Sequence, residues 1–476
     1  MRTLLKNGWL LSSQLGAVPE KVNIVIEDGL IREITSRDIS DSDQFNQIID
    51  AEGKFLMPGL VNGHMHSYAN FVKATTENIP LEAWMLHIMA QGRCLEPEDL
   101  YWNAMLGAAE MLKTGTTCCM DHLAQGLDGL EAAMRAYEDI GMRATIAPMI
   151  GDKTYFETMP VDQSLVPSEL KTAQPPAVKT LIDTTVTLLK KWQGKDNRLG
   201  VAFGPSGPQR CTDELMKECM RLAIEYDTAW HSHVLESKVQ EQTAHFLYGK
   251  PMVVHLDEIG CLNERTSLVH AVWLTREEAK LAAARGSIIV HNPASNLILG
   301  SGIAPVNMYR ELGLTVGLGT DGANCGGSLN LLEVMKLAAM LHKFSNPDPT
   351  NWITAAETLE MATINSAKVS LRHKEIGKLE AGRRADIVIL NPRNSTALQP
   401  IQNPLWQLVN SEWGAGVDTV LVEGRVVVQG GKLTLVDEEK LYGEANRRAA
   451  LVVEKYQKLT TDVEQQSKYL TELLSK

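Results

Sequence analysis

Two histidines separated by one residue, His64 and His66, follow the apolar run from Phe55 to Gly63. Residues two apart on a strand point to the same side, so both imidazoles can face one point in space. A metal ion requires this arrangement from a pair of nitrogen ligands. The pair therefore predicts a metal site at the end of a strand.

Other residues of the metal-binding type also follow apolar runs. His231 and His233 follow one run, His270 and His291 follow the next two, and Asp321 follows the last. Twelve histidines placed at random over 476 residues would rarely put six at four such ends. We therefore interpret the set as one site. His231, two positions before His233, could belong to it directly or could orient a metal ligand by a hydrogen bond.

Three histidines and one carboxylate leave an open coordination position, which a catalytic zinc or iron site keeps for water. A divalent metal lowers the pKa of this water toward neutrality, so hydroxide forms without an activated serine or cysteine. Glu236, His270 and Asp321 are the titratable groups at the same strand ends that could carry protons. This chemistry is metal-assisted hydrolysis.

Repeated βα units must position these residues. Between Phe55 and Glu380, short apolar runs alternate with helical stretches such as Glu98–Lys113, Asp213–Tyr226 and Thr275–Arg285. The expected strands cover 55–63, 116–121, 143–149, 199–204, 228–233, 267–270, 287–291 and 315–320. Eight such units predict an α/β fold, a (β/α)8 TIM-type barrel with its active site at the carboxyl ends of the strands.

Strand periodicity also occurs near both chain ends, with Asp28-Gly29 as a hairpin signal. We expect residues 1–54 and 384–435 to pair as a small discontinuous β-sandwich domain beside a barrel over 55–383. Residues 436–476 should form a C-terminal helical tail. From Thr461 onward this tail is polar enough to be mobile or to contact another subunit.

Composition and charge restrict the classes of molecule that the protein can bind. A net charge of −12 without a basic block argues against nucleic acid or an anionic membrane surface. Lys6, Asn7 and Gly8 interrupt the only candidate signal peptide, and no run reaches the length of a membrane span. Seven cysteines, an odd number, suit reduced thiols. These features predict a cytoplasmic protein with a small-molecule substrate.

Five motifs occur in order: Pro58-Gly-Leu-Val-Asn-Gly-His-Met-His66, His233-Val-Leu-Glu236, Val269-His-Ala-Val272, His291-Asn-Pro-Ala-Ser-Asn296 and Gly319-Thr-Asp-Gly322. On these motifs the chain resembles the amidohydrolase superfamily. More narrowly, it is similar to the branch of the triazine hydrolases and the adenosine-type and S-adenosylhomocysteine-type deaminases. The resemblance covers about residues 1 to 430.

The resemblance implies a role for each motif residue. His64, His66, His233 and Asp321 would hold one divalent metal, zinc or alternatively iron. Glu236 would protonate a ring nitrogen of the substrate, and His270 would orient the metal-bound water. Asp321 would also take the proton of that water and pass it to the departing amine.

Relatives with two metals use a carboxylated lysine after the fourth strand, where this chain has Phe203-Gly-Pro-Ser206, so a mononuclear site is expected. Some triazine-degrading relatives lack the acid and imidazole that this chain keeps as Glu236 and His270. The favoured reaction is therefore removal of an amino group, as ammonia or amine, from an N-heterocycle. Hydrolysis of a C–Cl or amide-type C–N bond in a triazine-like substrate is the alternative, and a noncatalytic metal-bound barrel is the third.

The substrate side departs from the nucleoside deaminases at three places. Their loop histidine, carboxylate-binding arginine and ribose-binding glutamate have no match in Gly204–Arg210, near Pro148 or in Gln91–Cys94. This argues against S-adenosylhomocysteine or methylthioadenosine as the substrate.

The remaining candidates for substrate binding are Trp84, His122 and His291. Trp84 could stack on a heterocycle or belong to the core, and His122 could reach the barrel mouth. His291 could contact the substrate or organise its loop. Members of such families are commonly dimers or larger, so a homodimer or larger homo-oligomer is expected.

Overall fold

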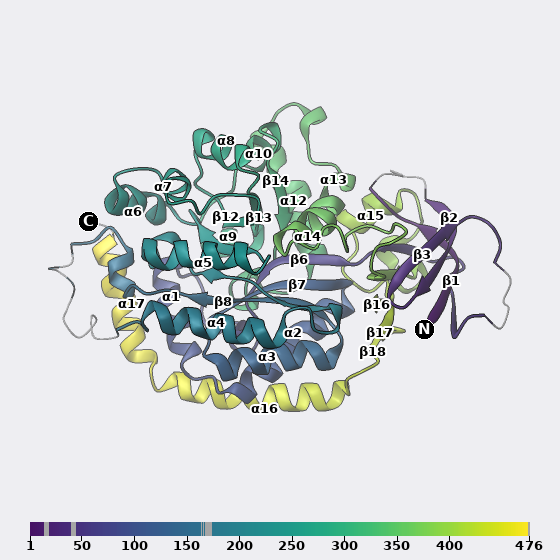
Figure 1. The fold of residues 1–476 in the computed structure, drawn as a ribbon, viewed down its shortest axis with the longest axis horizontal. Helices are drawn as coiled ribbons and strands as arrows, with labels where there is room; N and C mark the ends of the chain where they lie inside the picture. Colours follow the sequence, from purple (N-terminus) through teal and green to yellow (C-terminus); the bar gives the residue numbers. More distant parts are fainter. Residues whose placement is uncertain (14–18, 40–43, 163, 165, 167–173, 475–476) are drawn as a thin grey trace.

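The protein was analysed as a computed structural model, which describes residues 1–13, 19–39, 44–162, 164, 166 and 174–474. Two parts lie side by side (Figure 1). A body of parallel strands and surrounding helices carries the predicted site. A sheet built from both ends of the chain flanks it, near the N-terminus.

Two parallel sheets form the centre of the body. The first contains β6 (Leu60–Met65), β7 (Thr116–Leu123), β8 (Arg143–Ile150), β9 (Leu199–Val201) and β10 (Gly204–Pro205). The second contains β11 (Trp230–Val234), β12 (Thr266–His270), β13 (Ile288–His291) and β14 (Thr315–Leu318). A parallel bridge between Phe203 and Trp230 connects the two sheets. On the other side, the Asp321 amide donates to His64 O at 3.0 Å. The parallel α/β arrangement that the sequence predicts is thus confirmed as a curled parallel sheet.

The expected strand over 55–63 is wrong in one respect, because the structure divides it at Gly59. The first piece, β5 (Phe55–Pro58), pairs with strands of the chain-end sheet, and β6 pairs with β7. A Cβ atom at Gly59 would lie 2.1 Å from Thr117 Oγ1. Only glycine allows this close approach, which lets the chain pass from one sheet to the other.

The chain-end sheet has nine strands in the order β18-β17-β16-β15-β5-β1-β2-β3, with β4 paired to β1. Its other strands are β1 (Arg2–Leu10), β2 (Glu20–Glu27), β3 (Leu30–Thr35), β4 (Gln47–Asp50), β15 (Ile387–Leu390), β16 (Val417–Val422), β17 (Arg425–Gln429) and β18 (Lys432–Leu433). Asp28 and Gly29 both have positive φ and connect β2 to β3, as the hairpin signal predicts. The N- and C-terminal strands meet where β5 pairs with β15.

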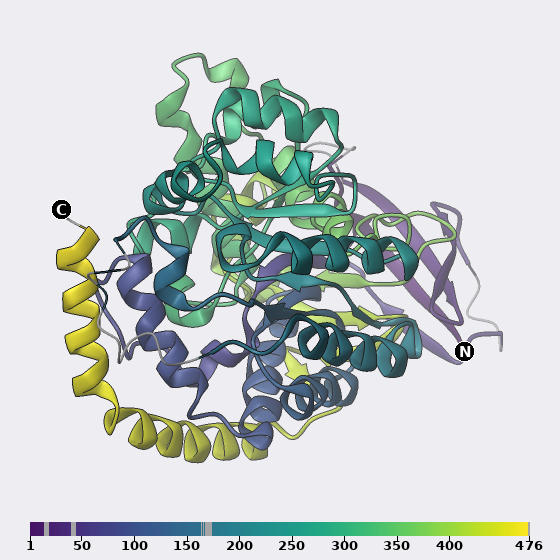
Figure 2. The ribbon, with the colours of Figure 1, turned by 60° about the vertical axis from the view of Figure 1, so that its left-hand side comes forward.

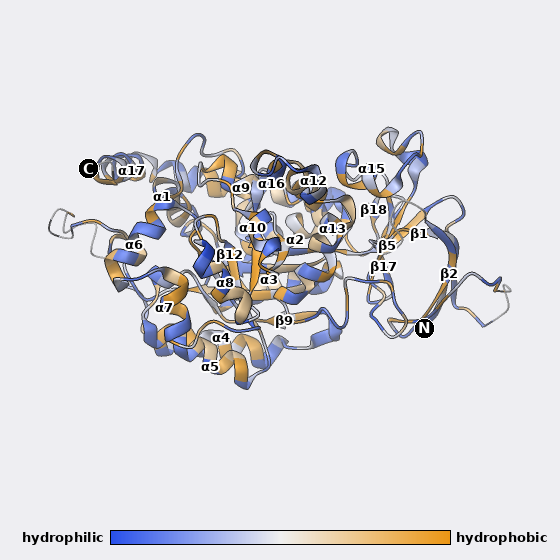
Figure 3. Cartoon of the chain, turned by 90° about the horizontal axis from the view of Figure 1, so that it is seen from above, coloured by the Kyte–Doolittle hydropathy of each residue, from blue (hydrophilic) through white to orange (hydrophobic). Residues whose placement is uncertain are grey.

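The helices around the body begin with α1 (Leu81–Gly92), α2 (Pro97–Lys113), α3 (Leu127–Ile140), α4 (Val178–Trp192), α5 (Asp213–Glu225), α6 (Lys238–Tyr248), α7 (Met252–Glu258), α8 (Arg276–Ala284) and α9 (Pro293–Ile298). They continue with α10 (Val306–Glu311), α11 (Ala323–Gly326), α12 (Leu331–Leu341), α13 (Ala355–Glu360), α14 (Ser366–Val369) and α15 (Pro404–Asn410). Hydrophilic and hydrophobic residues mix along helices such as α5 (Figure 3). Thr212 and Thr275 cap α5 and α8 by accepting from the amides of Leu215 and Glu278. The three expected helices correspond to α2, α5 and α8.

Two long helices, α16 (Glu438–Gln457) and α17 (Thr460–Leu474), finish the described chain and wrap around the outside of the body (Figures 1 and 2). The sequence predicts that residues after Thr461 are mobile or contact another subunit, but α17 lies against α1 and buries Val463 and Leu470. Residues 475 and 476 of this tail lie outside the described residues.

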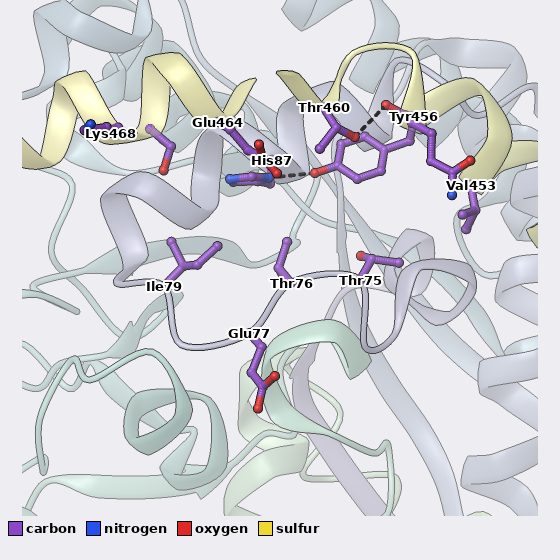
Figure 4. A pocket seen from close by; sticks show the side chains of 12 residues that line it. Thr75, Thr76, Glu77, Ile79, His87, Val453, Tyr456, Thr460, Glu464 and Lys468 are labelled. Carbon is purple, nitrogen blue, oxygen red and sulfur yellow. Dashed lines mark hydrogen bonds between the residues drawn. The ribbon is translucent and has the colours of Figure 1, made fainter. Parts of the chain in front are cut away.

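A cavity of about 540 Å³ separates these helices from residues 75–79. At its edge, Tyr456 of α16 points toward His87 of α1, with 2.6 Å between the hydroxyl and Nδ1 (Figure 4). In the described parts of the chain, no helix has the length and apolarity needed to cross a membrane.

Candidate active site

The four residues expected to hold the metal lie together at the carboxyl ends of β6, β11 and β14. Asp321 Oδ1 is 3.7 Å from His64 Nε2 and 3.3 Å from His66 Nε2. The ring centroid of His233 is 5.0 Å from that of His64 and 5.4 Å from that of His66. All four side chains are buried. Three strand ends therefore bring one carboxylate and three imidazoles to one place.

Backbone carbonyl groups orient two of these rings. His66 Nδ1 lies 2.5 Å from His122 O, and His233 Nδ1 lies 2.6 Å from Ser206 O. Because a carbonyl oxygen only accepts, each Nδ1 carries the proton and donates it. The lone pair of each ring is therefore on Nε2, the atom left to bind a metal.

A chain of two side chains orients His64. Ser267 Oγ donates to Trp230 O at 3.3 Å and accepts from His231 Nδ1 at 2.6 Å. His231 Nε2 then accepts from His64 Nδ1 at 2.8 Å. This order leaves the lone pair of His64 on Nε2, a buried atom without a hydrogen-bond partner among the described residues. His231 thus lies behind a ligand candidate and fixes its tautomer.

The donor set fits a divalent metal. Burial, together with the neighbouring imidazoles, lowers the pKa of His64 and His233 well below the usual value, so both rings are neutral and able to bind. Ligand atoms of His64, His270 and Asp321 lie within 4.8 Å of one another, as do those of His64, His122 and His233. Imidazoles with one carboxylate suit zinc or iron. His64, whose Nε2 has no hydrogen-bond partner among the described residues, belongs to both groups.

The three residues expected to carry protons face one another beside this set. His270 Nε2 lies 3.5 Å from Glu236 Oε2 and 3.7 Å from Asp321 Oδ2. Its other nitrogen, Nδ1, lies 2.8 Å from Asn296 Oδ1, which orients the ring. The imidazole therefore stands between two carboxyl groups.

The two carboxyl groups differ in their protonation. Burial, and next the charge of Asp321, raises the pKa of Glu236 well above its usual value. Burial acts on Asp321 in the same direction, but the imidazoles of His270 and His66 and the amide of Gly322 outweigh it and lower the pKa of Asp321. Environments that separate the pKa values of two neighbouring carboxyl groups are typical of an acid and base pair.

The backbone at these strand ends is strained. Leu235, His270, Ala271 and Asp321 have φ values of 52°, 70°, 50° and 62°. Residues other than glycine rarely adopt positive φ, and such strain gathers at active sites where the surrounding structure enforces it. The strain directs side chains from β12 and β14 into the site, and no periodicity in the sequence could have indicated it.

Comparison with known proteins agrees with this geometry. The sequence model of the amidohydrolase family matches residues 55–427. The chain belongs to the amidohydrolase family. The family resemblance that the motifs indicate is thereby confirmed.

Two relatives of this amidohydrolase are deaminases. A 5-methylthioadenosine/S-adenosylhomocysteine deaminase of Syntrophomonas wolfei is 32% identical over 466 residues, which cover 96% of this chain and all of the relative. A 5'-deoxyadenosine deaminase of Methanopyrus kandleri is 33% identical over 435 residues, covering 90% and 95% of the two chains. At the level of enzyme class, the expected metal-dependent aminohydrolase is confirmed.

Two solved structures with zinc are also similar. An adenosine deaminase from Xanthomonas campestris aligns with a TM-score of 0.84 at 25% identity, covering 95% of this chain and 98% of its own. An atrazine chlorohydrolase from Arthrobacter aurescens aligns with a TM-score of 0.85 at 26% identity, covering 94% and 100%. Both support a divalent metal in the site of this amidohydrolase.

The three candidates for substrate binding have different surroundings. The His122 ring stacks near His233, with centroids 4.8 Å apart, and its Nε2 donates to Gly204 O at 3.1 Å. Trp84 is buried, and its Nε1 has no partner among the described residues. It lines a cavity of about 390 Å³ that also includes Asn324, three residues after Asp321. Substrate contacts of His122 and Trp84 stay predictions.

The structure does not bring His291 into the cluster. Its Nε2 lies 3.1 Å from Nε2 of His342, and the two ring centroids are 5.0 Å apart. Successive residues of a strand point to opposite sides, and Val290 packs with Val269 in the core between the strands, so His291 points outward. A substrate contact of His291 is therefore not supported, because the motif indicates position along the chain but not the side of the strand.

Sequence reasoning missed two polar residues beside the site. Glu82 on α1 accepts a hydrogen bond from Ser237, the neighbour of Glu236. Arg210 follows Ser206 in the loop after β10, and its charge acts on the pKa of several site residues. The loop has no regular periodicity, so the only signal was an isolated arginine shortly after a predicted strand end.

Proposed function

We propose that this amidohydrolase removes an amino group, as ammonia or an amine, from an N-heterocyclic small molecule by metal-assisted attack of water. The observation that carries the proposal is the contact of His270 with both Glu236 and Asp321, beside the unpartnered Nε2 of His64. The two deaminase relatives support this reaction.

His64, His66, His233 and Asp321 would hold one divalent metal, zinc or alternatively iron. Such a metal lowers the pKa of a coordinated water and supplies hydroxide near neutral pH. The absence of a lysine in Phe203-Gly-Pro-Ser206 supports a single ion. The metal content of the purified protein tests the identity and number of the ions.

The protein groups would move the protons. Glu236 keeps its proton because burial raises its pKa, and it donates this proton to a ring nitrogen of the substrate. His270, fixed by Asn296, orients the attacking water through Nε2. Asp321 takes the proton of this water and passes it to the departing amine. Burial of all these groups excludes bulk water from the transfer.

Hydrolysis of a C–Cl or amide-type C–N bond is the second candidate, favoured by the similarity to the atrazine chlorohydrolase. Removal of the amino group is preferred because a protonated carboxyl group at Glu236 suits the activation of a ring nitrogen. Assays of aminated pyrimidines, purines and triazines separate the two, with ammonia, chloride and carboxylic acid measured in parallel. Release of chloride or carboxylic acid without ammonia would contradict the proposal.

We further propose that the curled parallel sheet is a closed (β/α)8 barrel over residues 55–383. Residues 1–54 and 384–435 would form a β-sandwich domain, and 436–476 a helical tail. Closure is supported by the hydrogen bond from the Asp321 amide to His64 O. A separate apolar core that includes Leu5, Ile24 and Ile389 supports the second domain.

A cytoplasmic location is proposed because all seven cysteines are buried as free thiols. A homodimer or larger homo-oligomer also stays a proposal, and light scattering of the purified chain measures it. The partner is a small molecule, in agreement with the acidic net charge of −12.

A further inference from the structure

Arg210 ends a short 3-10 helix, Pro208–Arg210, in the loop between β10 and α5. The same loop supplies Ser206 O, which accepts from Nδ1 of the ligand candidate His233. The Arg210 amide donates to Gly207 O at 2.9 Å, and Arg210 O accepts from the Asp152 amide at 3.3 Å. A loop tied at both ends in this way holds its arginine at a fixed place beside the metal site.

The guanidinium group of Arg210 is only partly used by the protein. Nη1 donates to Ser206 Oγ at 3.3 Å. Nε is buried, yet it has no hydrogen-bond partner within the described part of the chain. Leaving a buried donor unpaired destabilises the folded protein. The edge formed by Nε and Nη2 is therefore available to a group that the protein does not provide.

The charge of Arg210 reaches the reacting residues. Burial dominates the pKa shifts there, but Arg210 opposes the rise of the Glu236 pKa and adds to the lowering for His122, His233 and His270. The geometry places the cation there, because Arg210 Nη1 donates to Ser206 Oγ and the carbonyl oxygen of the same serine accepts from Nδ1 of the ligand candidate His233.

We infer that Arg210 binds the substrate directly through its Nε and Nη2 edge. The heterocycle would carry a planar pair of acceptor atoms, either a ring carboxylate or an oxo group next to a ring nitrogen that bears no proton. The two parallel N–H groups of this edge match such a pair in a bidentate contact, which a lysine cannot form. A carboxylate would also compensate the partly buried positive charge of Arg210. The inference rests on the proposed deamination and makes Arg210 a residue that determines substrate specificity.

The test uses matched aminated heterocycles with the metal-loaded enzyme. The probes are 4-aminopyrimidine, its 5-carboxylate and cytosine, and adenine with its 2-oxo and 8-oxo forms. We expect wild-type kcat/KM to favour the forms with a carboxylate or oxo group, and the preferred form tells the two sources apart. Arg210→Gln should lower kcat/KM for the preferred form by about 10–100-fold, the value of a bidentate contact, and change the parent heterocycle little.

Arg210→Lys keeps the charge but removes the fork, and it should lose most of the same preference. Arg93→Gln is the matched control, because exposed Arg93 lines a neighbouring cavity with Tyr68 and Met149. Metal content and thermal unfolding of each variant establish that the loop still holds His233. The inference would be overturned if Arg210→Gln lowered kcat/KM equally for a parent heterocycle and its carboxylate or oxo form, or if only Arg93→Gln lost the preference. Either result would leave the proposed deamination unaffected.

If no probe releases ammonia, the proposed function is wrong, and binding alone then tests Arg210. Titration calorimetry of 4-aminopyrimidine and its 5-carboxylate supports the inference if the carboxylate binds more tightly to wild type and not to Arg210→Gln. Equal binding of the two probes to wild type would overturn it.

Discussion

At the scale of single residues, Glu236 has the most distinctive environment. Its raised pKa means that the carboxyl group stays protonated at higher pH than an exposed glutamate. We expect kcat/KM to fall as pH rises through this pKa, because the proton for the ring nitrogen is lost. Glu236→Gln should lower kcat/KM by about 100–10,000-fold and remove this alkaline limb. A pH–rate profile of both proteins tests this, and an unchanged limb in the variant would assign the titration to another group.

The same shift has a consequence for stability. Because the folded pKa of Glu236 lies above its unfolded value, its contribution to stability is fully present below the unfolded pKa and is lost as pH rises through the folded pKa. Glutamine has no such loss. Metal-free Glu236→Gln should therefore gain stability relative to metal-free wild type between pH 5 and pH 8. Urea unfolding at both values measures the difference, and a constant difference would contradict the shift.

His231 acts on the metal only through His64. Substitution His231→Phe should weaken metal binding by about 10–100-fold, since a group behind a ligand fixes its tautomer. His291→Phe is the matched control, because it replaces another fully buried strand histidine that contacts His342 instead. Competition with a chromogenic chelator measures both affinities. Equal losses in the two variants would mean that packing, and not the tautomer, controls the metal.

At the scale of elements, Arg143, the first residue of β8, connects the body to the chain-end sheet. Its Nε and Nη2 donate to the two carboxylate oxygens of Asp386 at 2.8 Å, and Nη2 also donates to Glu423 Oε2 at 2.7 Å. Arg143 and Asp386 are both buried. Arg143→Met leaves a buried carboxylate without its cation and should lower the free energy of unfolding by about 3–5 kcal/mol.

The control for Arg143 is Arg285→Met, which removes an arginine that is half exposed and paired with Asp257. That loss should be about 0–1 kcal/mol. The double variant Arg143→Met/Asp386→Leu should recover part of the stability, because it removes the unpaired charge. Denaturant unfolding of all three variants measures these free energies. Equal losses of stability for the two arginine variants would contradict a special role for the contact between Arg143 and Asp386.

The strands and loops also show which features of the fold and the site the sequence could predict. The expected strands ended near the right residues because metal-type side chains follow apolar runs, so the metal and proton-transfer candidates came together as expected. The run from Phe55 to Gly63 suits a buried strand in either sheet, and the change of sheet depends on contact of Gly59 with Thr117, remote in sequence. The position of His291 beside His342 was not predictable, because the side of a strand follows from its exact register. Arg210 lies in a loop, where no periodicity indicates direction.

At the scale of the whole molecule, the C-terminal helices support the active site from outside. The sequence predicts a helical tail over 436–476 but not the packing of α17, because few of its residues are apolar and burial of Val463 and Leu470 against α1 only appears in the folded chain. In turn, α1 carries Trp84, and it also carries Glu82, which accepts a hydrogen bond from Ser237 next to Glu236. Contacts thus lead continuously from the tail to a proposed catalytic carboxyl group.

We expect a chain that ends at Lys458 to keep its metal but to lose stability and activity. Without α17, α1 loses its cover, so Glu82 and Trp84 are held less firmly and kcat/KM should fall while metal content stays unchanged. Leu470→Ala is a milder form of the same change and should lower the free energy of unfolding by about 2–5 kcal/mol, as for other fully buried leucines. The exposed neighbour substitution Glu472→Ala should have a much smaller effect. Thermal unfolding, metal analysis and kinetics of the three variants test the connection. If the shortened chain kept full kcat/KM, or lost its metal in proportion to its activity, the tail would not act on the site through α1.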